Sequence, residues 1–220
     1  MIRPVLILLS LLFLCMTPVK KKRIVFFGDS ITQMGVNKGG YIDRIQETLR
    51  EKGKQRNYEL LGAGIGGNKV YDLYLRMEED VLAKKPDMVL IYVGINDVWH
   101  KTSGIGTDIE KYERFYVAII KRLQAKKIKV AVCTPTVIGE KINKGNPQDE
   151  DLNAYSAVIR RLATAHNLAL IDLRKAFLDY EEKYNTANKE SGVLTTDRVH
   201  LNEKGNQLVA EEIMRELGML

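Results

Sequence analysis

The order of apolar runs along the chain is the feature that most restricts its fold. Five short runs rich in β-branched and aromatic residues lie at 23–27, 58–61, 87–93, 129–133 and 168–173. Continuous apolar runs of this length are typical of strands buried on both faces. Longer segments between and after them carry apolar residues at helical spacing, at 41–53, 70–85, 108–127, 152–167 and 201–217. This alternation predicts a parallel sheet with helices on both sides.

The predicted fold is one α/β domain, a three-layer α/β/α sandwich around a five-stranded parallel sheet. The chain has 220 residues, of which 45% are hydrophobic and 28% charged, the balance of an ordinary globular domain. No internal repeat interrupts the alternation, so we assign residues 20–220 to this single domain. In such sheets ligands bind outside the carboxyl ends of the strands, which makes the residues after each strand the candidates for a functional site.

Residues 1–19 form an apolar leader. Its run 5–16 contains Ser10 as the one polar residue, and it is shorter than a comfortable membrane span. We interpret it as a signal peptide, which predicts a secreted or periplasmic protein with no integral membrane domain beyond the leader. No small-residue cleavage site follows, and the basic run 20–23 resists translocation. One alternative is that the leader stays as a membrane anchor, either uncleaved or lipidated at Cys15. Another is that translation starts at Met16, which would make the protein cytoplasmic.

Composition argues against several kinds of site. The chain has two cysteines, and Cys15 lies in the apolar leader, so no disulfide framework is expected. Cys133 lies in a strand-like run, where we expect it to be a small buried residue. The three histidines lack metal-ligand spacing, so we expect no metal. Four positive charges of the net +6 lie at 20–23, and elsewhere basic and acidic residues alternate on expected helix faces. We therefore expect a solvated surface and no nucleic-acid partner.

The segment 60–70, LLGAGIGGNKV, matches the dinucleotide-binding pattern G-x-G-x-x-G at Gly62, Gly64 and Gly67. A dinucleotide fold places this pattern after its first strand, with an acidic residue about 20 residues on at the end of the next strand. Here the pattern follows the second strand, and the position about 20 residues on falls within a predicted helix. Glycines that expose backbone N–H groups also suit an oxyanion hole, which is the interpretation we prefer. A nucleotide-binding protein remains the alternative from another class.

Three further blocks follow predicted strands. GDSIT occupies 28–32, GIND occupies 94–97, and the segment TTDRVHLNEKG at 195–205 carries Asp197 and His200. Together with the glycine segment, these blocks resemble those of the SGNH hydrolases of the GDSL esterase and lipase group, from about residue 21 to the C-terminus. The resemblance implies a flavodoxin-like strand order and a serine hydrolase.

The resemblance assigns a role to each matching residue. Ser30 of GDS corresponds to the nucleophile, and Asp197 and His200 of D-x-x-H correspond to its partners. Gly67 and Asn96 correspond to residues that complete the oxyanion hole with the backbone N–H of Ser30. This set agrees with elementary chemistry, because a serine hydroxyl needs a base and the base needs a group that orients it. One departure is Gly62, where the family often has asparagine.

Each residue alone also has an ordinary structural explanation. A serine after a strand can cap a helix, an asparagine, glycine or aspartate can serve a turn, and a histidine before a helix can lie on the surface. The joint order of the blocks favours the catalytic interpretation. His100 is expected to line the pocket, and Trp99 either stacks on substrate or packs in the core. We interpret Asp29 and Asp97 as residues that order loops, and His166 as structural.

The resulting prediction is a serine esterase without cofactors that hydrolyses short-acyl carboxylic esters, such as acetyl esters of carbohydrates or small alcohols. No apolar insertion between the strands offers a long acyl channel. The loops at 98–108 and 134–151 are expected to shape the pocket. The alternative within the same family is a lysophospholipase or thioesterase. An alternative from another class is a binding module that keeps the fold but does not turn over a substrate.

Overall fold

The computed structural model describes residues 20–143 and 145–220, so the predicted leader at 1–19 lies outside the described residues. The strands are β1 (Lys22–Gly28), β2 (Tyr58–Gly64), β3 (Met88–Tyr92), β4 (Lys129–Cys133) and β5 (Ala169–Ile171). The α-helices are α1 (Ser30–Gly35), α2 (Tyr41–Glu51), α3 (Val70–Asp80), α4 (Ile95–Trp99), α5 (Ile109–Ala125), α6 (Asp149–Ala165), α7 (Leu173–Tyr184) and α8 (Glu203–Glu216). Two short 3-10 helices are η1 (Leu82–Lys84) and η2 (His100–Ser103).

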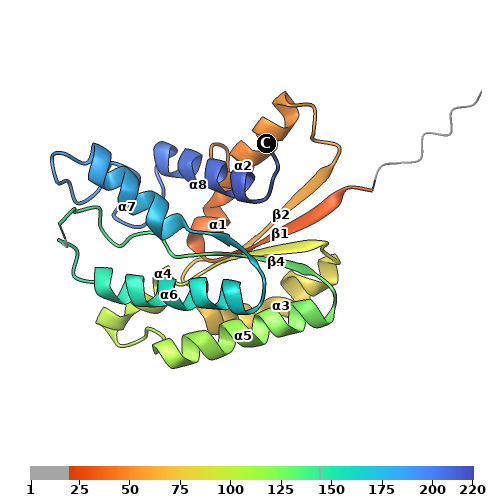
Figure 1. Ribbon diagram of the computed structural model, residues 1–220, viewed down its shortest axis with the longest axis horizontal. Coiled ribbons are helices and arrows are strands. Elements are labelled where there is room, and N and C mark those ends of the chain that lie inside the picture. The colour runs from red at the N-terminus through yellow and green to blue at the C-terminus, as the bar shows by residue number, and fades with distance from the viewer. Residues whose placement is uncertain (1–19, 144) are drawn as a thin grey trace, which may run out of the picture.

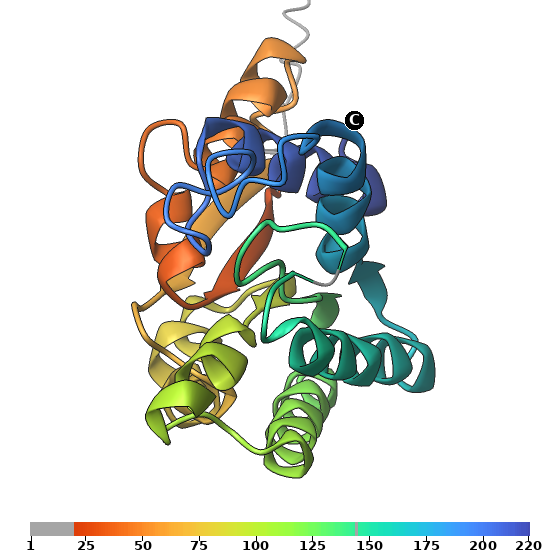
Figure 2. The ribbon, with the colours of Figure 1, turned by 90° about the vertical axis from the view of Figure 1, so that its left-hand side faces the viewer.

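The strands form one parallel sheet in the order β2-β1-β3-β4-β5 (Figure 1). This is the flavodoxin-like order, and it confirms the predicted α/β sandwich. Helices α3, α5 and α6 cover one face, and α2, α7 and α8 cover the other (Figures 1 and 2). Because α1 and the loop before α3 follow β1 and β2, they meet at the same edge of the sheet.

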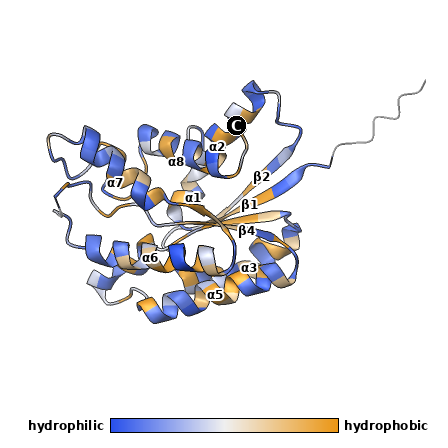
Figure 3. Ribbon diagram, in the orientation of Figure 1, coloured by the Kyte–Doolittle hydropathy of each residue, from blue (hydrophilic) through white to orange (hydrophobic). Residues whose placement is uncertain are grey.

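Two apolar cores, one on each face of the sheet, explain this arrangement. Alternate residues of β1 point to opposite sides, so that Val25 and Phe27 join the core under α3, α5 and α6, while Ile24 and Phe26 join the core under α2, α7 and α8. All four side chains are fully buried. The helices carry their apolar faces toward the sheet and their charged faces toward solvent (Figure 3). Cys133 is buried, as predicted.

Some helix boundaries differ from those predicted. The short helices α1 and α4 were not expected, because five or six residues carry too little periodicity to be recognised. The predicted helix over 70–85 ends at Asp80 and is followed by η1. Val81, which follows Asp80, has a φ of −124° and a ψ of −62°, outside the range of a regular helix, so α3 ends there. Within the described part of the chain, no helix has the length and apolarity required to cross a bilayer.

A buried arginine fastens the long connection between β4 and α6. The side chain of Arg174, at the start of α7, is 1% exposed. Its guanidinium donates to the Thr136 carbonyl at 2.9 Å, to Asn153 Oδ1 at 2.9 Å and to Asp149 Oδ1 at 2.7 Å. The connection, α6 and α7 therefore share one set of hydrogen bonds.

We predict that Arg174→Met lowers the free energy of unfolding by about 3 kcal/mol, because it leaves the partly buried Asp149 carboxylate without its cation. The control is Arg122→Met, which breaks an exposed pair with Glu78 and should cost less than about 1 kcal/mol. Urea unfolding of both variants measures the difference. Equal losses would contradict the stabilising role of Arg174.

Candidate active site

Ser30 lies at the first position of α1, directly after β1. Asp29 caps this helix, and its carboxylate accepts from the Ile31 N–H at 3.0 Å. Gly28 is required here, because a Cβ atom would lie 2.3 Å from Thr32 Oγ1 and 2.4 Å from the Tyr92 carbonyl oxygen. The tight approach of β1, α1 and β3 thus places the serine at the carboxyl edge of the sheet.

Ser30, His200 and Asp197 form one hydrogen-bonded series. Ser30 Oγ lies 3.0 Å from His200 Nε2, and His200 Nδ1 lies 2.7 Å from Asp197 Oδ2. A carboxylate only accepts, so Nδ1 carries the proton and Nε2 is left to accept from the serine hydroxyl. The structure therefore brings together the three residues that the sequence indicated, across 170 positions of chain between serine and histidine.

The turn that carries Asp197 and His200 is built from short-range contacts. Asp197 Oδ1 accepts from the backbone N–H groups of Val199 at 3.1 Å and His200 at 2.8 Å. Arg198 between them has a φ of 85°, a conformation that residues with a side chain rarely adopt. The Gly139 N–H donates to the Arg198 carbonyl at 2.8 Å and helps hold this conformation.

A buried glutamate holds the segment that leads into this turn. The Glu140 side chain is fully buried, and its carboxylate accepts from the backbone N–H groups of Val193 at 2.8 Å and Leu194 at 2.6 Å, and also from that of Thr195. Glu140 comes from the β4–α6 connection, so this connection supports the histidine turn from outside. This contact could not be predicted from the sequence, because it joins residues more than 50 positions apart.

The carboxylates around the site differ in their electrostatics. Burial raises the pKa of Asp197, but hydrogen bonds from the His200 ring and from two backbone N–H groups outweigh this and hold the pKa below its usual value. Burial raises the pKa of Asp29 to about 7 and that of Asp97 to about 6. Asp197 is therefore the ionised carboxylate that can stabilise a protonated imidazole, whereas Asp29 and Asp97 bond to backbone N–H groups.

The three glycines of the G-x-G-x-x-G pattern each have a packing or conformational reason. A Cβ atom at Gly62 would lie 2.4 Å from Val36 Cγ1, and one at Gly64 would lie 2.1 Å from the Gln33 nitrogen. Gly67 has a φ of 76°, in the left-handed region. The first two glycines let β2 approach α1, and the third shapes the exposed turn beside Ser30. The pattern is thus explained without a nucleotide.

Asn96 lies in α4, at the end of β3, and is 2% exposed. Its side-chain amide donates to the Asn68 carbonyl at 3.1 Å, which uses one of its two N–H groups. The neighbouring Asp97 accepts from the Val70 N–H at 3.2 Å and so ties α4 to the start of α3. The loop that carries Gly67 and the helix that carries Asn96 are therefore fixed to each other.

Arg76 in α3 joins three parts of the site, a role that was not predicted from the sequence. Its guanidinium donates to the Gly28 carbonyl at 2.7 Å, to the Ala63 carbonyl at 3.0 Å and to Asn68 Oδ1 at 2.6 Å. It also pairs with Asp80 at 2.6 Å. The ends of β1 and β2 and the Gly67 loop thus share one cation.

Trp99 and His100 end the α4 segment. Trp99 is partly buried and packs against the core, as one of its two predicted roles requires. Its contact with substrate stays a prediction. Burial, with the Lys69 ammonium nearby, lowers the pKa of His100. His100 Nδ1 is buried without a hydrogen-bond partner among the described residues. The serine bonds to His200, so His100 is not its base in this structure.

Within the described chain, no group of three or more His, Cys, Asp or Glu side chains is arranged to hold a metal ion.

Known proteins resemble this chain in sequence and in fold. The model of the GDSL-like Lipase/Acylhydrolase family matches residues 26–208. The crystal structure of the acetyl xylan esterase AlAXEase is 59% identical and superimposes with a TM-score of 0.87, covering 88% of this chain and 98% of that chain. An acetylxylan esterase of Geobacillus stearothermophilus is 28% identical over 90% of this chain and 94% of its own length. The uncharacterized lipoprotein YqeF of Bacillus subtilis (strain 168) is 27% identical over 86% of this chain and 87% of its own length.

Structures of catalytic mutants have been solved for the Geobacillus enzyme Axe2. In these mutants a serine, a histidine or an aspartate is replaced by alanine. They are 26–27% identical to this chain, with TM-scores of 0.79 and 0.80. The same three residue types form the hydrogen-bonded series of this chain.

The geometry predicts that the His200 Nδ1 proton gives a resonance far downfield of the amide region in the proton NMR spectrum, because it is held in a short bond to a carboxylate. Asp197→Ala should remove this resonance. Ser30→Ala and His166→Gln should keep it, since neither touches that bond. Persistence of the resonance in Asp197→Ala would show that the proton belongs to another group.

Proposed function

The chain belongs to the GDSL-like lipase/acylhydrolase family, and we propose that it removes acetyl groups from carbohydrate esters, with acetylated xylan and its oligosaccharides as the substrate class. It is a serine carboxylic ester hydrolase. The observation that carries the proposal is the series from Ser30 through His200 to Asp197 beside the Gly67 turn. The 59% identity to an acetyl xylan esterase supports the choice of substrate.

The proposed reaction proceeds through an acyl-enzyme. Ser30 Oγ attacks the acetyl carbonyl carbon while His200 Nε2 takes the hydroxyl proton, and Asp197 stabilises the imidazolium. The carbonyl oxygen becomes an oxyanion. His200 then gives the proton to the leaving sugar oxygen as the ester bond breaks, which leaves acetyl on Ser30. Water attacks this acetyl group while His200 takes one of its protons, and His200 then returns that proton to Ser30 Oγ as the bond to the acetyl group breaks and acetate leaves.

The oxyanion is stabilised by three donors from three different elements. These are the backbone N–H of Ser30 in α1, the backbone N–H of Gly67 after β2 and the side-chain amide of Asn96 in α4. One amide N–H of Asn96 is held by the Asn68 carbonyl, which orients the other. Such donors are effective because they are fixed before charge develops.

The exposure of the site supports a small acyl group on a large alcohol. The side chains of His200 and Asp197 are 25% and 51% exposed. Ile65, in the loop beside Ser30, is 44% exposed and Met34 is 40% exposed. An open surface of this kind admits a polysaccharide chain, whereas a long acyl chain needs an enclosed apolar groove.

We further propose that residues 1–19 direct the protein out of the cytoplasm, to a secreted or periplasmic location. The apolar run 5–16 supports this, as does the similarity to a Bacillus protein described as a lipoprotein. Fractionation of cells that express the full chain tests it. Recovery of the protein only from the cytoplasm would contradict export.

The substrate proposal predicts that acetylated xylo-oligosaccharides release acetate, and that kcat/KM for p-nitrophenyl esters falls from acetate to octanoate. An apolar channel would contribute about 0.8 kcal/mol per methylene, or about a fourfold rise at each step. A steady rise up to octanoate, with no release of acetate from the sugar, would instead favour a lipid or thioester substrate.

The contacts of Arg76 predict that Arg76→Lys lowers kcat by about 10- to 100-fold with little change in KM, because lysine cannot hold Gly28, Ala63 and Asn68 at once and the oxyanion donors shift. Arg122→Lys, in an exposed pair, is the control and should keep full activity. Melting temperatures of both variants establish that they are folded. A rise in KM at unchanged kcat would assign Arg76 to substrate binding instead.

A further inference from the structure

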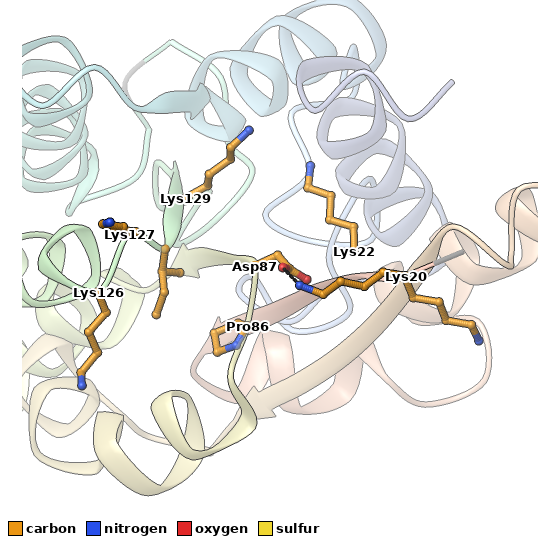
Figure 4. A pocket seen from close by; sticks show the side chains of 9 residues that line it. Lys20, Lys22, Pro86, Asp87, Lys126, Lys127 and Lys129 are labelled. Carbon is orange, nitrogen blue, oxygen red and sulfur yellow. Dashed lines mark hydrogen bonds and ion pairs between the residues drawn. The ribbon is translucent and has the colours of Figure 1, made fainter. Parts of the chain in front are cut away.

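Six lysines line one open cavity at the end of the sheet opposite the serine. The cavity has a volume of about 540 Å³ and is lined by Lys20, Lys21, Lys22, Pro86, Asp87, Lys126, Lys127, Ile128 and Lys129. We call these six lysines the basic edge. Figure 4 labels five of the six, which come from two segments far apart in the sequence and lie on either side of Asp87.

The topology explains why these lysines meet. Lysine-rich segments precede β1 and β4, and β3 lies between these two strands. In the register of the sheet, Ile24 of β1 lies beside Met88, and Met88 lies beside Lys129. The first residues of the three parallel strands are therefore level, and the lysines at and before the starts of β1 and β4 gather on one side. From the sequence alone, these charges are expected to belong to a solvated surface.

Little acidic charge balances the basic edge. Lys20 Nζ bonds to Asp87 Oδ1 at 3.1 Å, and it is the one lysine of the six with an ion pair within residues 20–143 and 145–220. The second carboxylate oxygen of Asp87 is taken by the Arg23 N–H at 2.8 Å. Burial and the nearby Lys129 lower the pKa of Lys22. The cations therefore repel one another, and a polyanion would relieve that repulsion.

The position of the basic edge relates it to the apolar leader and to the active site. The chain passes from Lys20 directly into residues 1–19, whose run 5–16 is apolar. Ser30 follows the other end of β1, so the basic edge and the serine are separated by the length of this seven-residue strand, roughly 20 Å. A surface that contacts the basic edge would therefore lie at the opposite end of β1 from α1, the helix that begins with Ser30 (Figure 1).

We propose that the basic edge docks the domain on an anionic phospholipid surface, with the ammonium groups against lipid phosphates. Each lysine close to such a surface adds to the attraction, so a cluster of six lysines around one carboxylate favours this partner. The lining of the cavity contains no aromatic side chain for stacking on bases, which disfavours single-stranded nucleic acid. This surface function is independent of the ester chemistry.

The test uses the full chain and sedimentation with vesicles of phosphatidylcholine, with and without phosphatidylglycerol. The variant is the triple substitution Lys126→Gln, Lys127→Gln and Lys129→Gln, which leaves the leader and its adjacent lysines unchanged. The control removes the same charge from α7 and the loop after it by Lys175→Gln, Lys183→Gln and Lys189→Gln. Hydrolysis of p-nitrophenyl acetate verifies that both variants are folded.

We expect the parent to bind phosphatidylglycerol vesicles more tightly than neutral ones, and the basic-edge variant to lose about 10- to 100-fold of that partitioning. The control variant should bind as the parent does, and added salt should weaken the parent. Equal binding to neutral vesicles, or equal loss in both variants, would overturn the proposal. Tight binding of the parent to DNA that competes with the vesicles would also overturn it and assign the surface to nucleic acid.

Discussion

The level ending of three neighbouring parallel strands is the constraint on which the site depends. β2, β1 and β3 lie side by side, and Gly28 is paired with Gly64 on one side and Tyr92 on the other. The residues that follow these strands must therefore share one small region. Gly28 and Gly64 allow β1, β2 and α1 to approach one another closely. The backbone carbonyl groups at the ends of these strands need hydrogen-bond donors. Arg76 supplies donors to two of these strand ends, so one cation links the sheet to the loop beside Ser30.

The sequence was sufficient for those features that depend on local patterns. Alternating apolar runs and amphipathic segments predicted the three layers, and the resemblance implied the strand order that the structure has. The spacing of Asp197 and His200 predicted a local contact, because a tight turn is enough to bring a carboxylate to an imidazole. The contact of His200 with Ser30 could be expected only from the resemblance, since it joins the two ends of the chain.

The supporting residues could not be predicted, because their partners are set by tertiary packing. Glu140 resembles any glutamate in a polar loop, yet it is fully buried and binds three backbone N–H groups before Asp197. Arg76 lies in an ordinary amphipathic helix, and only the position of that helix brings it to Gly28. Lysines that precede different strands form one surface only when the register of the sheet is known.

The central claim is that Ser30 carries the acetyl group during turnover. Rapid quenching of the enzyme in acid during hydrolysis of acetylated xylo-oligosaccharide, followed by mass spectrometry of its peptides, tests this most directly. We expect an acetyl group on the peptide that contains Ser30, and none on that peptide in Ser30→Ala, which should also release no acetate. Acetyl on a different side chain, or undiminished acetate release by Ser30→Ala, would contradict it.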